Sequence, residues 1–214
     1  IESGQGTLEV RWRNLKLRDL SIFKSLYNGK DLSGWKTTGN WIPQKDDSLL
    51  IQPRDGEKGW QRYDMYLWSE KKYKDFVLDV EYAYPPGGNS GVYFRVGDLT
   101  DPVGKGIEAQ ILDSSNKKGP LGSHDHGGIV GTDAAASKNM SRPPNEWNRM
   151  VVTCQGSHLQ VELNGEQIID IQLDKTAMKD RPLEGYIGFQ DHGQPNNIKF
   201  RNIRIRRLDQ KSPS

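Results

Sequence analysis

The chain has 214 residues, and its 30 basic and 28 acidic side chains leave a formal net charge of +2 at pH 7. This near balance argues against a nucleic-acid partner, and no apolar run approaches the roughly 20 residues of a membrane span. The 23 Gly and 11 Pro residues indicate many turns and few long helices, while 6 Trp, 8 Tyr and 5 Phe supply bulky core material.

The two ends of the chain resemble each other. Val10–Leu20 can be laid over Ile198–Leu208 so that four of the 11 pairs are identical and six are conservative. Edge strands often look alike, but the Arg-Asn pair recurs in register. We therefore expect residues 1–20 to form a terminal strand. We favour the interpretation that this strand is the end of a preceding, similar domain of the same chain. Residues 21–208 then form the main domain and 209–214 a tail.

The main domain consists of short alternating runs separated by turns. In chain order, strands are predicted at residues 48–52, 75–84, 90–96, 106–113, 149–155, 158–164, 166–173, 185–191 and 197–208. Asn164-Gly165 between two such runs predicts a hairpin. Residues 114–148 are rich in Gly, Ser, Pro and His and predict a functional or mobile loop. Strands and helices do not alternate, so the pattern favours an all-β antiparallel sandwich over an α/β fold.

Three of these strands carry chemically useful side chains on one face. Side chains alternate across a sheet with period two, so the apolar positions of each strand predict which residues lie on the opposite face. That face collects Asn89, Tyr93, Arg95, Glu108, Gln110, Gln190 and His192. A carboxylate, a guanidinium, an imidazole and several amides together are typical of a sugar site.

Glu108 is the first candidate for catalysis, although pairing with Arg95 would explain it equally as a structural carboxylate. His192 has a pKa suited to proton transfer near neutrality, but a histidine at a strand end is often only a turn residue. Arg95 can clamp a carbonyl or hydroxyl group through its planar fork, or form an ion pair with Glu108 or Glu81.

The predicted substrate-binding residues surround this catalytic group. They are Tyr93, Gln110, Gln190, Asn89, Glu81 and Trp60. Aromatic rings stack on sugars, so Tyr93, Trp60 and Trp41 are candidates for such contacts, with a core role as the default for either tryptophan.

Metal and thiol chemistry have weaker signals. His124 and His126 flank Asp125 and can approach one metal ion, but no third ligand is identifiable and a polar loop tip is favoured. Asp98 and Asp101 are candidates for a Ca²⁺ site. Ca²⁺ is therefore the one metal ion considered, and the sequence predicts no other cofactor. The single cysteine, Cys154, lies in an apolar strand and is expected to be a buried, inert thiol.

Longer segments show a family resemblance. The opening run Phe23–Trp35 resembles the 3-keto-disaccharide hydrolase domain family, and similar segments follow in order to about residue 208. These are Asp75–Glu81, Gly88–Arg95, Gly106–Asp113, Glu146–Asn148, Leu163–Gly165, Gly188–Gly193 and Phe200–Ile203. The resemblance implies a jelly-roll sandwich of the concanavalin A-like lectin and glucanase type. It also implies a bacterial, extracytoplasmic protein, periplasmic or secreted, that acts on glycosides oxidised at C3.

The implied chemistry is an elimination followed by hydration. A ketone at C3 acidifies the hydrogen at C2, so Glu108 or His192 would remove it while the other assists the leaving group and Arg95 holds the enolate oxygen. Two alternatives are ordinary hydrolysis by Glu81 and Glu108 as a carboxylate pair, and a non-catalytic, lectin-like carbohydrate-binding module. A cleft roofed by residues 114–148 would favour the enzyme, and a shallow open groove the binding module.

Overall fold

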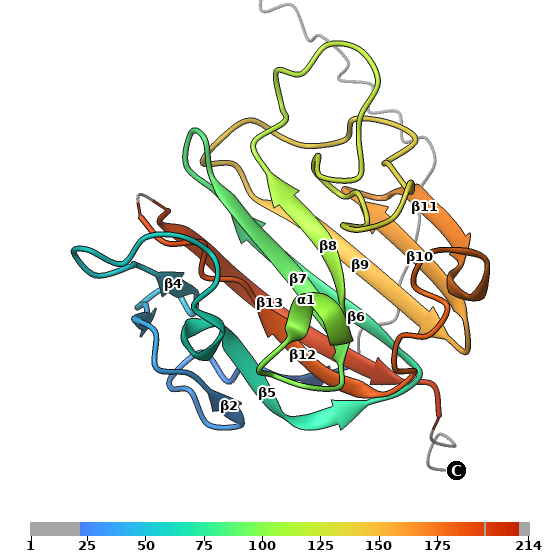
Figure 1. The fold of residues 1–214 in the computed structure, drawn as a ribbon. Coiled ribbons are helices and arrows are strands. Elements are labelled where there is room, and N and C mark those ends of the chain that lie inside the picture. Colours follow the sequence, from blue (N-terminus) through green and yellow to red (C-terminus); the bar gives the residue numbers. More distant parts are fainter. Residues whose placement is uncertain (1–21, 195, 210–214) are drawn as a thin grey trace, which may run out of the picture.

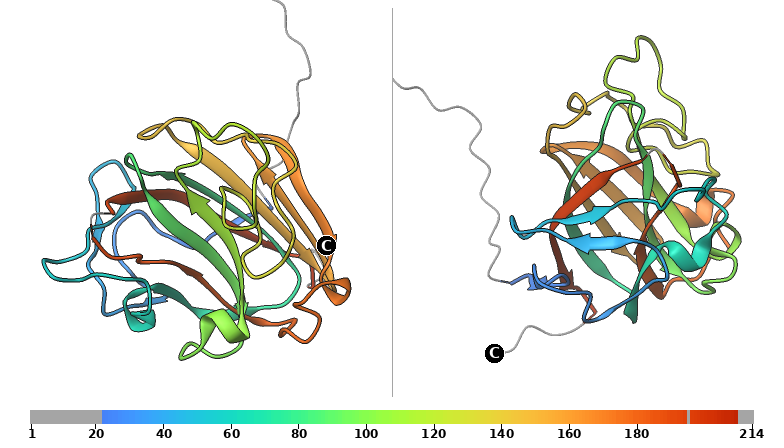
Figure 2. Two further views of the ribbon diagram at one scale, coloured as in Figure 1. Left: turned by 45° about the horizontal axis from the view of Figure 1, so that its top comes forward. Right: turned by 90° about the vertical axis from the view of Figure 1, so that its left-hand side faces the viewer.

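The computed structural model describes residues 22–194 and 196–209, and these residues form two antiparallel β-sheets packed face to face (Figures 1 and 2). The all-β jelly-roll sandwich predicted from the sequence is confirmed. The proposed strand in residues 1–20 lies outside the described residues. No helix within the described ranges is long and apolar enough to cross a membrane.

The larger sheet, called sheet A, contains eight strands. In spatial order they are β11 (Glu166–Gln172), β10 (His158–Leu163), β9 (Asn148–Gln155), β6 (Phe76–Ala83), β13 (Ile198–Arg207), β4 (Leu49–Ile51) and β3 (Trp41–Pro43), with β1 (Lys24–Ser25) also paired to β13. Asn164 and Gly165 both have positive φ, at 52° and 90°. This is the backbone that a two-residue hairpin turn requires, so the predicted hairpin between β10 and β11 is confirmed.

The smaller sheet, called sheet B, contains five strands. In spatial order they are β2 (Trp35–Lys36), β5 (Leu67–Tyr73), β12 (Gly185–Phe189), β7 (Asn89–Val96) and β8 (Ile107–Leu112). All nine predicted strands are present, but β1, β2, β3 and β5 are not among them. Within the described residues, helical structure is limited to α1 (Pro102–Lys105) and the 3-10 turns η1 (Tyr63–Met65) and η2 (Leu173–Lys175).

The core fills the space between the sheets. Along β6 the alternating Phe76, Leu78, Val80 and Tyr82 are fully buried, as the period-two pattern predicts. Rings from the two sheets meet there: the centroids of Phe189 in β12 and Phe200 in β13 lie 4.8 Å apart. The other face of sheet B is turned away from the core, toward the viewer of Figure 1.

Cys154 lies in the same core. It is free and fully buried, and burial raises the pKa of its thiol to about 12. The predicted inert thiol is therefore confirmed, because the reactive thiolate form is absent at neutral pH.

The long loop between β8 and β9 closes one side of the sandwich. Residues 127–130 run beside β8, where Val130 N donates to Glu108 O at 3.1 Å and Gln110 N donates to Gly128 O at 2.9 Å. Further on, Ser137 N donates to Ile168 O in β11 at 3.0 Å. The loop therefore extends the edge of sheet B and joins it to the edge of sheet A, with Ile129 buried in the core.

Candidate functional site

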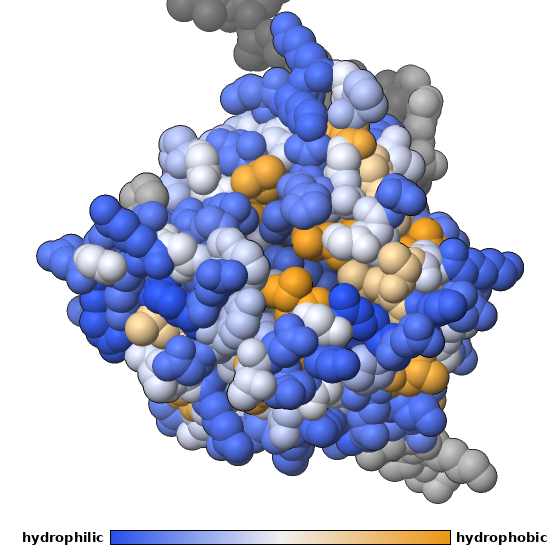
Figure 3. Space-filling view, in the orientation of Figure 1, coloured by the Kyte–Doolittle hydropathy of each residue, from blue (hydrophilic) through white to orange (hydrophobic). Residues whose placement is uncertain are grey.

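A row of side chains crosses the outer face of sheet B. The strand register places these five residues side by side, from β2 to β8: Lys36, Trp68, Gly188, Tyr93 and Glu108. Paired residues in neighbouring strands share a face, so the row brings Tyr93 and Glu108 together as predicted. The space-filling view of this face shows hydrophobic and hydrophilic residues around a shallow hollow near its centre (Figure 3).

Glu108 lies at the β8 end of this row, where its carboxyl group is buried and forms no ion pair with any described residue. Its side chain is 7% exposed, Tyr93 Oη donates to its Oε2 at 2.8 Å, and no ion pair reaches it from any residue that the structure describes. Burial raises the pKa of the carboxyl to about 7, although the hydrogen bond from Tyr93 acts in the opposite direction. The group therefore exchanges a proton near neutral pH, which is what general acid–base catalysis needs.

Glycine at position 91 makes room for this carboxyl. A Cβ added to Gly91 would lie 2.0 Å from Oε1 of Glu108 and 2.8 Å from its Cγ. The side chain of Glu108 thus lies flat across the backbone of β7, and any larger residue at position 91 would displace it.

Four buried oxygen acceptors on β7, on β8 and in the segment that follows β12 have no hydrogen-bond partner among the residues that the structure describes. These buried atoms are Asn89 Oδ1, Glu108 Oε1, Gln190 Oε1 and Asp191 Oδ2. Unpaired buried polar atoms are costly, and a cluster of acceptors is complementary to a ligand that supplies hydroxyl donors. Gln110 lies two residues after Glu108, on the same face of β8. It is 8% exposed, and its Oε1 accepts a hydrogen bond from Ile111 N at 3.1 Å.

An aromatic cluster supports the carboxyl from the side of β5. The ring centroids of Tyr66 and Trp68 are 5.5 Å apart, and Tyr93 lies 5.6 Å from Tyr66 and 5.8 Å from Trp68. Burial raises the pKa of both tyrosine hydroxyls, so they stay protonated hydrogen-bond donors. Tyr66 and Trp68 were not predicted as site residues, because β5 itself was missed.

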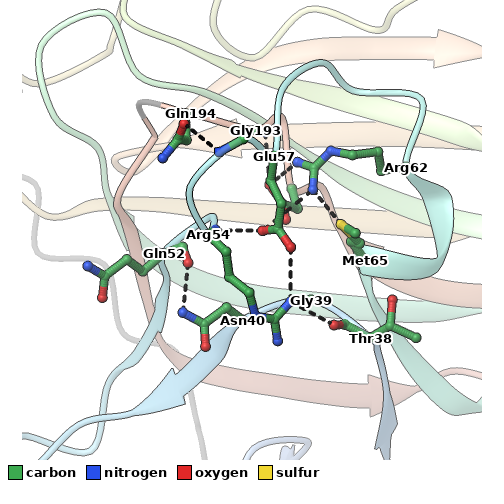
Figure 4. A network of polar contacts seen from close by, with 12 residues as sticks. Thr38, Gly39, Asn40, Gln52, Arg54, Glu57, Arg62, Met65, Gly193 and Gln194 are labelled. Carbon is green, nitrogen blue, oxygen red and sulfur yellow. Dashed lines mark hydrogen bonds and ion pairs between the residues drawn. The ribbon is translucent and has the colours of Figure 1, made fainter.

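A loop spanning residues 52–62 forms one rim of the site and is tied to the chain that follows β12. Arg62 Nη2 pairs with Asp191 Oδ1 at 2.9 Å, and Gln194 N donates to Glu57 O at 2.8 Å. Figure 4 shows Arg62, Glu57 and Gln194 within one network of polar contacts. Asp191 thus has a cation partner, which Glu108 lacks, although burial raises the pKa of Asp191 as well.

Two predicted residues lie at this rim. Trp60 is 36% exposed, and its carbonyl oxygen accepts a hydrogen bond from Tyr66 Oη at 2.7 Å. His192 is half-buried and follows Asp191, and burial lowers the pKa of its imidazole. The ring is therefore neutral at pH 7. Stacking by Trp60 and proton transfer by His192 stay predictions.

The predicted place of Arg95 is wrong. Arg95 has φ of 52°, and the register between β7 and β12 shifts beside it, so the strand bulges and the side chain leaves the face that carries Tyr93. The guanidinium is fully buried and donates to Lys74 O at 2.9 Å, Gly156 O at 2.7 Å and Asp75 Oδ1 at 3.0 Å. It therefore anchors loops at the end of the sandwich.

Glu81 is also misplaced by the sequence prediction. It belongs to β6 of sheet A, and its Oε2 accepts from Arg201 Nε at 2.8 Å. It cannot flank one sugar bond with Glu108, because the core between the two sheets separates the two strands. Trp41 is a core residue, 5% exposed, whose indole donates to Met65 O at 2.9 Å.

The suggested metal ligands are engaged in other contacts. Tyr82 Oη lies 2.6 Å from His126 Nε2, and the Nδ1 of the same ring lies 2.8 Å from Leu112 O. Burial lowers the pKa of His126 to about 4, so the neutral ring fastens the loop to the core. Asp101 accepts from Gly104 N as the cap of α1. Within residues 22–194 and 196–209, no group of three or more His, Cys, Asp or Glu is arranged to hold a metal ion.

Three surface hollows are lined by residues other than Glu108. Two, of about 610 and 560 Å³, share Asp133, Ala134 and Ile171 at the seam between the long loop and β11. A third, of about 540 Å³, lies on the outer face of sheet B and is lined by Tyr63, Trp68 and Leu99. The chemistry points to Glu108 rather than to the two seam hollows, since neither is lined by Asn89, Glu108, Gln190 or Asp191.

The chain is similar to known proteins over most of its length. Residues 22–206 match the family model of the 3-keto-alpha-glucoside-1,2-lyase-like domain. A 3-keto-disaccharide hydrolase of Bacteroides thetaiotaomicron is 25% identical over 89% of this chain and 80% of its own. Two solved structures from Parabacteroides distasonis, both assigned to the glycosyl hydrolases, superpose with TM-scores of 0.72 and 0.73. They are 26% and 22% identical, over 87% and 91% of this chain and 99% of each of theirs.

Proposed function

Since the chain belongs to the 3-keto-alpha-glucoside-1,2-lyase-like domain family, we propose that it cleaves 3-keto-glycosides by elimination and hydration. Family membership and the glycosyl-hydrolase neighbours support a glycoside-hydrolase-like activity. The finer mechanism rests on the chemistry of the site. A carbohydrate substrate fits a sheet face that offers unpaired acceptors and amide groups to hydroxyls.

One observation carries the proposal: a buried carboxyl without a cation, with its pKa raised to about 7, lies among unpaired acceptors. A carboxylate kept only for stability would have a cation or several donors to offset the cost of its burial. Glu108 has one donor, Tyr93, on Oε2. Its Oε1 is left to accept a proton from a ligand.

The proposed reaction proceeds in two steps. In the first, Glu108 Oε1 takes the proton from C2 of the sugar, the C1–C2 double bond forms, and the C1–O bond breaks as the leaving oxygen accepts a proton. His192, whose neutral ring retains one N–H, assists the leaving oxygen. In the second step, water adds across the double bond, with its hydroxyl at C1 and a hydrogen at C2.

The enolate oxygen needs donors other than Arg95. The side-chain amides of Asn89, Gln110 and Gln190 each carry an NH₂ group, and all three lie on the face that bears Glu108. We assign the stabilisation of the developing negative charge to these amides. Ordinary hydrolysis by two carboxylates is disfavoured, because Glu81 lies on sheet A and Asp191 is paired with Arg62.

The direct test compares 3-keto-glucosides with their unoxidised parents, with and without a chelator. We expect cleavage of the keto compounds alone, because only a ketone at C3 acidifies the hydrogen at C2. Loss of activity with chelator would add a metal to the account. Equal cleavage of both compounds would refute the elimination, and saturable glycan binding without any turnover would assign the chain to the lectin-like, non-catalytic class.

A further inference from the structure

The cleft of about 540 Å³ on the outer face of sheet B has walls that are mostly apolar. Tyr63, Leu99 and the 2%-exposed Trp68 supply the apolar lining, and the polar lining residues are Lys36, Thr37, Thr38, Gln61, Asp64 and Thr100. The register pairs Lys36 with Trp68, so the cleft lies on the same sheet face as Glu108. Mostly apolar walls with a few polar groups are typical of small-molecule sites.

Three hydroxyl groups and one carboxylate oxygen in the lining of this cleft have partners within the protein. Thr37 Oγ1 donates to Met65 O at 3.0 Å, and Thr38 Oγ1 donates to Asp64 Oδ2 at 2.8 Å. On the opposite wall, Thr100 Oγ1 donates to Asp98 Oδ1 at 2.7 Å. The protons of these three hydroxyls are therefore already used, which leaves Lys36, Gln61 and the second oxygen of Asp64 as the other polar groups of the lining. This distinguishes the cleft from the Glu108 region, where buried acceptors are unpaired.

The tryptophan indole is satisfied in the same way. Trp68 Nε1 donates to Tyr63 O at 2.7 Å, and a Cβ added to Gly188 would lie 2.2 Å from the indole ring. The ring therefore lies flat over β12 and is fixed by its neighbours. It contributes an apolar surface to the cleft.

The cleft and Glu108 stand at opposite ends of one transverse row. Trp68 is three strands from Glu108, which corresponds to about 14 Å at the usual strand spacing. The rings that line the cleft also touch the site: Tyr63 packs edge-on against Tyr66 at 5.8 Å, and Trp68 packs against Tyr93 at 5.8 Å. A glycoside with its reacting sugar ring at Glu108 can thus direct its other half toward the cleft.

We infer that this cleft binds an apolar aglycone, so that the favoured substrates are 3-keto-glycosides of aryl or arylalkyl alcohols rather than 3-keto-disaccharides. The inference rests on the proposed function, because it assigns the leaving group of the same reaction. Aromatic and aliphatic side chains bury such an aglycone without leaving hydroxyls unpaired.

The experiment compares three substrates whose leaving groups are aliphatic alcohols; the sugar hydroxyl is the most acidic of the three, so leaving-group acidity alone would favour the disaccharide. They are the 3-keto-glucosides of methanol, of 2-phenylethanol and of glucose, measured as kcat/KM. A phenyl glycoside is avoided, because its better leaving group would accelerate elimination without any contact to the cleft. We expect kcat/KM for the 2-phenylethyl compound to exceed the other two by about tenfold or more, the usual effect of one well-filled hydrophobic pocket.

Leu99→Lys places a charge in the cleft wall, and Leu183→Lys is the matched control, because Leu183 is 46% exposed and does not line the cleft. We expect Leu99→Lys to remove the advantage of the 2-phenylethyl compound through KM and to leave the methyl compound unchanged, while the control changes neither. Preference for the disaccharide, or an equal loss on all three substrates, would overturn the inference and leave the proposed function standing. No cleavage of any 3-keto compound by the unaltered protein would overturn both.

Discussion

Two buried carboxylates on the outer faces of the two sheets have opposite surroundings. Asp79 in sheet A has a fully buried side chain and accepts from Arg149 Nε at 2.8 Å and Nη2 at 2.6 Å, with Arg204 Nη2 at 3.6 Å. Within the described part of the chain, Glu108 in sheet B has a single neutral donor, the hydroxyl of Tyr93, and no cation. Burial favours the protonated form of a carboxyl, and nearby cations favour the ionised form.

The comparison separates stability from reactivity. The carboxylate of Asp79 is held by two guanidinium groups and so links strands β6, β9 and β13. A carboxyl with raised pKa and an unpaired oxygen changes its protonation near neutral pH, at a cost in stability that a structural role does not explain. Perturbed pKa values of this kind gather at functional sites.

The largest expected effect is the loss of activity in Glu108→Gln. The amide keeps the shape of the side chain but cannot accept the C2 proton, so kcat on a 3-keto-glucoside should fall by at least about a hundredfold. Circular dichroism should show the fold unchanged. Glu70→Gln is the control, since Glu70 is exposed on β5. Full activity in Glu108→Gln would end the assignment of Glu108 as the base.

The next effect is on the pH dependence of stability. The pKa of Glu108 is about 7 in the folded chain and 4.5 in the unfolded reference, so its ionisation destabilises the fold as the pH rises through that window. Urea unfolding should show that Glu108→Gln gains about 3 kcal/mol relative to the unaltered protein between pH 4 and pH 8. A difference that does not vary with pH would mean that the carboxyl titrates normally.

Asp79→Asn sharpens the comparison from the other sheet. Breaking the bidentate contact with Arg149 should lower the free energy of unfolding by about 2 kcal/mol, because hydrogen bonds to charged groups are the stronger kind. The kcat on a 3-keto-glucoside should not change. In the control, Asp209→Asn removes a surface pair with Arg207 and should cost less than about 1 kcal/mol. Reduced kcat in folded Asp79→Asn would show that the two faces are coupled.

The smallest effect is expected from Tyr93→Phe. The hydrogen bond from Tyr93 lowers the pKa of Glu108 against the effect of burial, so its loss should move the acid limb of the kcat/KM profile upward by about one pH unit. Tyr66→Phe is the matched control, because Tyr66 Oη donates to Trp60 O instead. An acid limb that stays in place in Tyr93→Phe would show that another group sets it.

Strand periodicity was enough to predict the sandwich and the shared face of Tyr93, Glu108 and Gln110. It failed for Arg95, because a positive φ and a register shift turn that side chain through the sheet. A bulge of one residue leaves no signal in the alternation of apolar and polar residues. It failed for Glu81 because alternation within a strand does not say which sheet the strand joins.

The strand β5 was missed for a related reason. Leu67, Trp68 and Ser69 are all buried in succession, because the outer face of β5 is covered by the aromatic rings of Tyr66 and Tyr93. Its apolar and polar residues therefore do not alternate. Asn89 and Gln190 were predicted as site residues, but the sequence does not show that their side-chain oxygens are unpaired, because that depends on packing between strands that are distant along the chain.

Cleavage of a 3-keto-glucoside in D₂O tests the central claim most directly. Elimination followed by hydration removes the original hydrogen from C2 and replaces it from solvent, so the sugar product should carry deuterium at C2. The incorporation must exceed that of preformed 3-keto-glucose kept in the same solution, which corrects for spontaneous exchange. A cleaved product that retains its original hydrogen at C2 would contradict the account, because it would place the chemistry at C1 alone and leave Glu108 without a proton to remove.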